Sequence, residues 1–63
     1  MIRQFQKIRL KNGREAIVVE ILEPGTSFLV DVEIGDEEFN TDEIDISEIQ
    51  SVFEEIETPI IAA

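Results

Sequence analysis

The chain has 63 residues, of which 15 are acidic and five are basic, and its formal net charge is −10. A chain of this length is expected to form one small domain with a thin core. It contains no cysteine and no histidine, which excludes a disulfide, a thiolate or imidazole zinc site and the commonest general base. We therefore predict a non-enzymatic domain without a cofactor or metal. No apolar run has the length of a membrane span or a signal peptide, so we expect a cytoplasmic protein without a membrane partner.

The first predicted element is a β-hairpin whose strands span residues 7–11 and 14–23. Between them, Asn12–Gly13 favours a two-residue type I′ turn, because both residues tolerate positive φ. In that register Ile8 faces Ile17 across the hairpin.

A second turn is predicted at Pro24–Gly25, and a third strand follows over residues 27–34. The loop is expected to have two or four residues, and four is favoured because a type II turn suits a two-residue hairpin poorly. Either even length buries the same side chains, whereas a three-residue loop would reverse the face. The predicted buried face consists of Ile8, Leu10, Ile17, Val19, Ile21, Phe28, Val30, Val32 and Ile34.

The opposite face of this predicted sheet changes character from strand to strand. The first strand contributes basic residues, the second apolar residues and the third acidic residues; they are Lys7, Arg9, Lys11, Ala16, Val18, Asp31 and Glu33. Such a face is either solvated, with exposed ion pairs that are individually worth little, or a partner-binding surface around Val18 and Leu29.

A turn at residues 35–37 leads into a short predicted fourth strand over residues 38–42. We expect Phe39 to point inward, with Thr41 on the same face. From the lead-in before the first strand, Phe5 is expected to join the core or to cap one open end of the sheet.

Two interpretations compete for the segment that follows. In the first, Asp45 caps one helical or 3₁₀ turn, with Glu48 completing a capping box, and residues 49–53 form a last short strand. In the second, a continuous helix covers residues 44–56, because its apolar residues fall on one helical face.

The last predicted unit is a flexible tail over residues 54–63, which follows a domain of residues 1–53. Pro59 discourages regular structure, and chain ends fray unless they are tied down. Two β-branched residues near the end, Ile60 and Ile61, are unusual in a solvated tail. They could add an edge strand to a partner or to a second copy, so a homodimer through a sheet edge or through the tail is one expectation.

The predicted order of a three-stranded meander, a short strand, a helical turn and a last strand is the layout of an SH3-like barrel. The first hairpin resembles that of KOW-type modules and of small bacterial and phage proteins of unknown function. The resemblance covers residues 5–53, and its matching positions are Ile8, Leu10, Asn12, Gly13, Val18 and Ile21. It implies an all-β, five-stranded SH3-like barrel with one helical or 3₁₀ turn before the last strand.

The chain differs from the functional subclasses of that group. It lacks the basic loops of the RNA-binding members, and its negative charge repels nucleic acid. Direct nucleic-acid binding through the basic residues of the first hairpin is therefore not expected. It also lacks the tyrosine and tryptophan residues with which peptide-binding SH3 domains hold proline-rich segments.

Charge is distributed unevenly along the chain. All five basic residues lie in the first 14 positions, whereas the segment from Glu33 to Glu57 contains eleven carboxylates and no lysine or arginine.

These carboxylates do not indicate a metal site or a catalytic site. The EF-hand spacing that favours calcium is absent, and a cleft for a catalytic pair of carboxylates is not expected in so small a domain. The candidate partner-binding residues are Asp36, Glu37, Glu38, Asp42, Glu43 and Asp45, together with Val18 and Leu29.

Two functions fit this distribution of charge. The first is a small protein-binding module whose partner docks on a sheet edge or on the Val18 and Leu29 face. The alternative is an acidic nucleic-acid mimic that occupies the basic channel of a nucleic-acid-binding enzyme, in the manner of anti-restriction or anti-CRISPR proteins of phages and mobile elements. Spaced carboxylates would steer such a complex rapidly and in a salt-dependent way.

Overall fold

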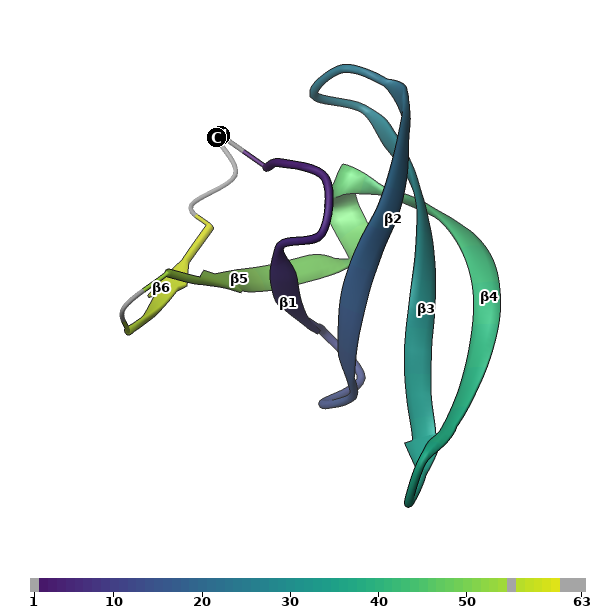
Figure 1. Cartoon of the computed structure of the whole chain (residues 1–63). Coiled ribbons are helices and arrows are strands. Elements are labelled where there is room, and N and C mark those ends of the chain that lie inside the picture. Colours follow the sequence, from purple (N-terminus) through teal and green to yellow (C-terminus); the bar gives the residue numbers. More distant parts are fainter. Residues whose placement is uncertain (1, 55, 61–63) are drawn as a thin grey trace.

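The computed structural model describes residues 2–54 and 56–60, and it confirms an all-β domain. Its strands pair in an antiparallel manner in the order β4-β3-β2-β1-β5-β6 (Figure 1). The elements are β1 (Lys7–Leu10), β2 (Glu15–Glu23), β3 (Ser27–Gly35), β4 (Glu38–Asp45), the 3₁₀ turn η1 (Ile46–Glu48), β5 (Ile49–Phe53) and β6 (Glu57–Pro59).

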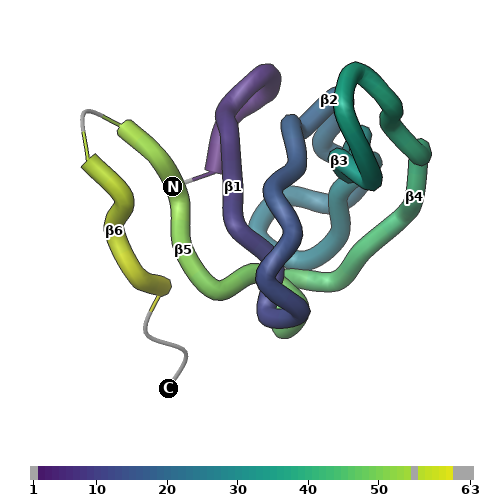
Figure 2. Tube along the Cα trace, turned by 90° about the horizontal axis from the view of Figure 1, so that it is seen from below, coloured from purple at the N-terminus to yellow at the C-terminus, as the bar shows by residue number. Residues whose placement is uncertain are grey.

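The sheet is open, so the prediction of a closed five-stranded barrel is wrong. β6 pairs with β5, with Thr58 opposite Val52, and a sixth strand therefore occupies the side of β5 that faces away from β1. The curled sheet ends at β4 on one side and at β6 on the other (Figure 2). The predicted flexible tail thus contains an ordered edge strand. The expectation for Ile61 lies outside the described residues.

The first hairpin has a three-residue loop, which corrects the predicted two-residue turn. The Leu10 N–H donates to the carbonyl of Arg14 at 2.8 Å, and Gly13 adopts a φ of 90°. A left-handed residue at the end of a three-residue loop is a common hairpin solution. As a result Ile8 pairs with Ala16 instead of Ile17, and the first half of β2 is turned over relative to the prediction.

A register shift in β2 reverses this effect farther along the strand. Val18 lies opposite Val30, but Ile21 lies opposite Phe28, because the register slips by one residue between Val18 and Glu20. An inserted residue of this kind returns the following side chains to the other face. The predicted burial was therefore wrong for the strand segment before the shift and for the end of β3: Ile17 and Ile34 are exposed and Val19 is half-buried, whereas Ala16 and Val18 are buried.

The second hairpin also has a three-residue loop, Pro24 to Thr26, so the prediction of two or four loop residues is wrong. A second register shift, between Ile21 and Glu23, compensates for the odd loop length, and Ile21 therefore still lies opposite Phe28 as an even loop would have placed it.

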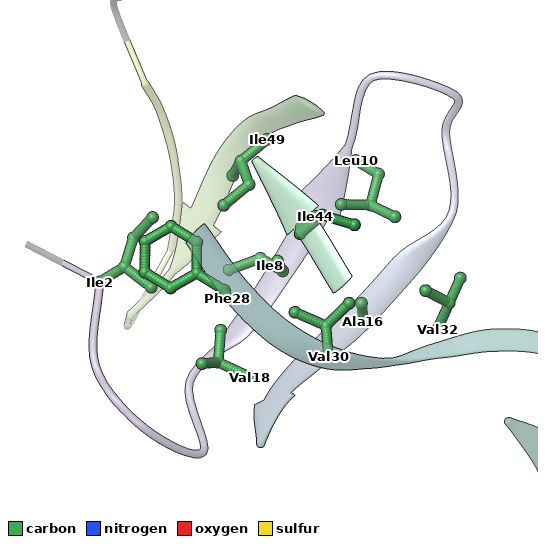
Figure 3. Packing of buried hydrophobic residues seen from close by; sticks show 10 residues of the cluster. All are labelled: Ile2, Ile8, Leu10, Ala16, Val18, Phe28, Val30, Val32, Ile44 and Ile49. Atoms are coloured by element: carbon green, nitrogen blue, oxygen red, sulfur yellow. The ribbon is translucent and has the colours of Figure 1, made fainter. Parts of the chain in front are cut away.

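The hydrophobic core gathers side chains from the N-terminal segment, from β1 to β3, and from the ends of β4 and β5 that flank η1 (Figure 3). Phe5 is 71% exposed, so its predicted place in the core or as a lid is wrong; Ile2 supplies the apolar side chain from that segment. The buried residues are Ile2, Ile8, Leu10, Ala16, Val18, Phe28, Val30, Val32, Ile44 and Ile49.

The segment after β3 follows the first of the two competing interpretations. β4 is longer than predicted, η1 is a single 3₁₀ turn, and β5 follows it directly, so the continuous helix is wrong. Phe39 and Thr41 share a face of β4, as expected, but Phe39 is 51% exposed and points away from the core. Its predicted inward orientation fails because it lies opposite Glu33, an outward residue of β3.

Candidate protein-interaction surface

The turn between β3 and β4 carries the first of the predicted partner-binding carboxylates. It lies at the end of a hairpin that projects away from the other strands (Figure 1). Asp36 and Glu37 form this turn and Glu38 begins β4, and all three side chains are exposed. Glu37 adopts a φ of 59°, the left-handed conformation that a tight hairpin turn can require.

Strand geometry divides the next two carboxylates between the two faces of β4. Asp42 lies opposite Val30 and Glu43 lies opposite Leu29. Successive side chains of a strand alternate, so Asp42 is on the core side of the sheet and Glu43 is on the outer side. Both are exposed, because β4 is the last strand of the sheet. We call the five exposed carboxylates around this strand the acidic edge: Asp36, Glu37, Glu38, Asp42 and Glu43.

Asp45, the sixth predicted carboxylate, has a structural role. Its side chain accepts a hydrogen bond of 2.9 Å from the N–H of Ser47, and the Glu48 carboxylate accepts one of 2.9 Å from the N–H of Asp45. This is the predicted capping box, and it starts η1. The Ser47 N–H holds the pKa of Asp45 below its usual value. Asp45 is therefore engaged within the fold and does not belong to the acidic edge.

The basic residues of β1 are paired on the outer face of the sheet. Arg9 Nε donates to the Glu57 carboxylate at 2.7 Å, and Arg9 Nη2 lies 3.5 Å from Glu15. Lys7 Nζ lies 2.5 Å from the other oxygen of Glu15. Both cations also lie 5.4 Å from the centre of the Phe53 ring, within the range of a cation–π contact. The cations of β1 are thus already engaged within the sheet.

These ion pairs raise the pKa values of the basic partners and lower those of the acidic partners. Hydrogen bonding to Glu15 raises the pKa of Lys7 and lowers that of Glu15. The hydrogen bond between Arg9 and Glu57 raises the pKa of the guanidinium and lowers that of the carboxyl group. A compensated charge cluster therefore occupies the β1 side of the outer face.

The acidic edge has no such compensation in the part of the chain that the structure describes. There, the ion pairs join Arg3 to Glu54, Lys7 to Glu15, and Arg9 to both Glu15 and Glu57. None of them reaches β4 or the turn before it. Nor do the described residues contain a group of three or more side chains that could hold a metal ion. The charge on β4 therefore stays uncompensated by the rest of the described chain.

The second predicted surface, around Val18 and Leu29, is not formed. Val18 is 0% exposed and lies opposite Val30 in the core, and Leu29 is half-buried on the outer face. Two apolar side chains that the prediction had placed inside, Ile17 of β2 at 38% and Phe39 of β4 at 51%, are exposed on that face instead. Sequence reasoning missed both because it placed the first half of β2 and the whole of β4 in the opposite orientation.

An apolar groove of about 510 Å³ lies at one end of the sheet. Sequence reasoning missed it, because two of its walls come from segments that were expected to be a lead-in and a free tail. Its lining residues are Ile2, Ile21, Pro24, Gly25, Phe28, Ile46, Val52 and Ile60.

Comparisons with protein-family models, with curated proteins and with solved structures gave no significant match. None of the helices in the described residues is long and apolar enough to cross a membrane.

Proposed function

We propose that this protein is a small, non-enzymatic binding module, that its partner is a protein with a positively charged surface, and that the acidic edge is the contact. The observation that carries the proposal is the separation of charge. The cations of β1 are paired with Glu15 and Glu57, whereas the acidic edge is exposed and has no cation within ion-pairing distance among the described residues.

This arrangement of charge favours a positively charged protein as the partner for two reasons. Uncompensated carboxylates attract a basic surface over a distance and accelerate association. They also repel nucleic acid and anionic membranes, which favours a protein as the partner.

We also propose that the sheet is an open relative of the SH3-like layout, since the meander, fourth strand, 3₁₀ turn and fifth strand follow in that order. Fold alone does not specify function, so the proposal depends on the charge.

The test compares two triple variants with matched changes of charge. One variant neutralises the acidic edge at its tip, with Asp36→Asn, Glu37→Gln and Glu38→Gln. The other neutralises exposed carboxylates elsewhere, with Glu20→Gln, Glu23→Gln and Glu54→Gln. Proteins captured from lysate at low salt are quantified for both variants. We expect the first variant to lose at least about tenfold of the captured partner, because charged interface pairs affect both the rate and the affinity of association. Equal retention by the two variants would contradict the proposal.

A nucleic-acid mimic is the second candidate function. It is favoured by the spacing of the carboxylates, which follow the length of β4 and continue through the turn instead of converging on one pocket. Strand residues rise by about 3.3 Å each, so the charges are spread out, as they are along a phosphate backbone. Elution of the captured partner with duplex DNA or RNA distinguishes the two functions. Displacement by nucleic acid indicates the mimic, and retention indicates a partner that recognises the module in another way.

A further inference from the structure

Within residues 2–54 and 56–60, the strand that carries the acidic edge is also an unpaired edge of the sheet. β4 has eight residues and is the last strand of the sheet on its side. The other edge strand, β6, has only three described residues and ends at Pro59, which lacks a backbone donor. β4 is therefore the longer available template for an additional strand.

The register shows which backbone groups of β4 point away from β3. The N–H of Ile46 donates to the carbonyl of Thr26 at 2.7 Å, and this pair continues the antiparallel register of Ser27 with Asp45. Backbone groups alternate in direction along a strand. The even-numbered positions of β4 consequently face β3, and the odd-numbered positions, 39, 41, 43 and 45, face the free edge.

Two of these four outward N–H groups are already satisfied by carboxylates of the same chain. The N–H of Glu43 donates to Asp42 Oδ1 at 2.9 Å, and the N–H of Asp45 donates to Glu48 at 2.9 Å. Both bonds agree with the phase set by Ile46, because these donors are not needed in the ladder with β3. At the other two outward positions, Phe39 and Thr41 in the middle of the acidic edge, the N–H has no such bond to any residue that the structure describes.

We propose that β4 binds an extended, lysine- or arginine-containing segment of its partner by strand addition, with main-chain hydrogen bonds at Phe39 and Thr41. This inference rests on the proposed function and specifies the form of the partner. A basic side chain of the added strand pairs with Asp42. The Asp42 carboxylate then releases the N–H of Glu43, which extends the new ladder by one more bond. Charge recognition and main-chain pairing are in this way coupled through one side chain.

Charge selects this occupant over a second copy of the chain. Two β4 strands side by side would bring the same carboxylates together, and like charges across a strand pair are destabilising. Acidic side chains on an edge strand also protect it from pairing with neutral strands. A basic extended segment avoids the repulsion between like charges and can pair with the edge, since its side chains neutralise the carboxylates while its backbone forms hydrogen bonds with the outward groups of β4.

The test uses a synthetic peptide of about seven alternating lysine and valine residues, a typical strand length, with blocked ends. Its binding to the full-length protein is followed by backbone amide chemical shifts at low salt. The control peptide has the same sequence with methylated backbone nitrogens, which keeps the charge and removes the donors. We expect the unmodified peptide to shift the amides of Phe39, Thr41 and Glu43, and the methylated peptide to bind at least about tenfold more weakly, because each lost main-chain bond contributes about 1 kcal/mol.

Two variants locate the contact on the protein. Thr41→Pro removes an outward donor, and because proline is tolerated on an edge strand when its nitrogen faces solvent, the fold is expected to survive. The Thr41→Pro variant should bind the unmodified peptide at least about tenfold more weakly than the wild type does, and its weak binding of the methylated peptide should be unchanged. Asp42→Asn should weaken the binding of the lysine peptide and abolish the peptide-induced shift of the Glu43 amide.

Equal binding of the two peptides would overturn strand addition. If that binding were still lost in the Asp36→Asn, Glu37→Gln, Glu38→Gln variant, the proposed function would stand while this inference failed. If neither peptide bound, or if binding ignored the triple variant, the acidic edge would not recognise basic segments and both would fail. Self-association of the free protein through β4, seen as the same amide shifts on raising its concentration, would assign the edge to a second copy and would also overturn the inference.

Discussion

Arg9 and Glu57 lie 48 positions apart in the sequence, and Arg9 Nε donates a hydrogen bond of 2.7 Å to the Glu57 carboxylate. The same carboxylate accepts a hydrogen bond from the hydroxyl of Ser51, which is buried on β5 between the two strands. β6 is therefore held by side chains from both β1 and β5 in addition to its backbone ladder. A short terminal strand that contains a proline is ordered through this contact.

The contact predicts a pH dependence of stability. The Arg9 guanidinium and then the Ser51 hydroxyl lower the pKa of Glu57 in the folded state. Such a group contributes its full stability above its unfolded pKa, about 4.3, and loses it as the pH falls through the lower folded value. Glu57→Gln should therefore lower the melting temperature at pH 7, and the gap to the wild type should close in acid. Thermal melts across pH measure it, with Glu20→Gln as the control; a gap that is constant from neutral to acidic pH would contradict the assignment.

The orientation of the first hairpin predicts different costs for two identical substitutions. Ile8 is 0% exposed and Ile17 is 38% exposed, although both were expected in the core. Ile8→Ala should cost about 2–5 kcal/mol, and Ile17→Ala clearly less. In a domain of this size 1 kcal/mol corresponds to about 4–8 °C in melting temperature. If Ile8→Ala does not fold, Ile8→Val, at about 0.5–1.5 kcal/mol, makes the same comparison with Ile17→Val. Equal costs would show that the hairpin has the two-residue register.

The three glycines predict a contrast that depends on backbone conformation alone. Gly13 and Gly25 have φ values of 90° and 74°, and an added Cβ would meet nothing within 4 Å at either position. Gly13→Ala and Gly25→Ala should each destabilise the domain by about 1–2 kcal/mol, because L-residues resist the left-handed region. Gly35 is not left-handed, and its nearest neighbour to an added Cβ lies 3.9 Å away. Gly35→Ala should be neutral or stabilising by up to about 1 kcal/mol. Denaturant unfolding measures all three, and a loss at Gly35 equal to the others would refute this account.

The excess of negative charge predicts a salt dependence. A net charge of −10 opposes compaction through self-repulsion, and salt screens it beyond a Debye length of about 10 Å at 0.1 M. The melting temperature should therefore rise from low to moderate salt. The rise should be smaller in the triple variant that neutralises the tip of the acidic edge. A melting temperature that falls with salt would show that the ion pairs around Arg9 outweigh the repulsion.

Local chemistry was sufficient to predict the positions of the turns and of the cap, but not the lengths of the two hairpin loops, which have three residues each instead of an even number. The Asp45 and Glu48 pair starts η1 as expected, because both partners of a capping box lie within four residues and need no tertiary context. The left-handed glycines at both hairpins follow from the same kind of information. Strand orientation was harder to predict, because residues 16–19 are apolar without interruption. Such a run satisfies either face of a sheet, and one extra loop residue decides between them.

The candidate site was predictable in charge but not in form. The carboxylates could be counted in the sequence, and the uncompensated stretch was visible there. Within the described residues β4 stays unpaired because β6, a strand of three described residues, pairs with β5 instead, where it is held by Ser51, six positions from Glu57, and by Arg9, 48 positions from it. No local sequence pattern predicts such a strand. Because a closed barrel was expected, the sequence did not predict that the strand carrying the acidic edge would be a free edge of the sheet.

The central position of β1 in the sheet affects how the chain folds. β1 pairs with β2, which follows it at once, and with β5, which begins 39 positions after the end of β1. The meander of β1 to β4 consists of hairpins between consecutive strands and can fold early, whereas one side of β1 stays unpaired until β5 docks on it. A chain at that stage exposes β1 and β4 as two unpaired edges, and such edges favour misassembly with other chains. The docking of β5 on β1 therefore removes one of the two exposed edges, and for this protein the step that most reduces its vulnerability to aggregation is a long-range strand pairing.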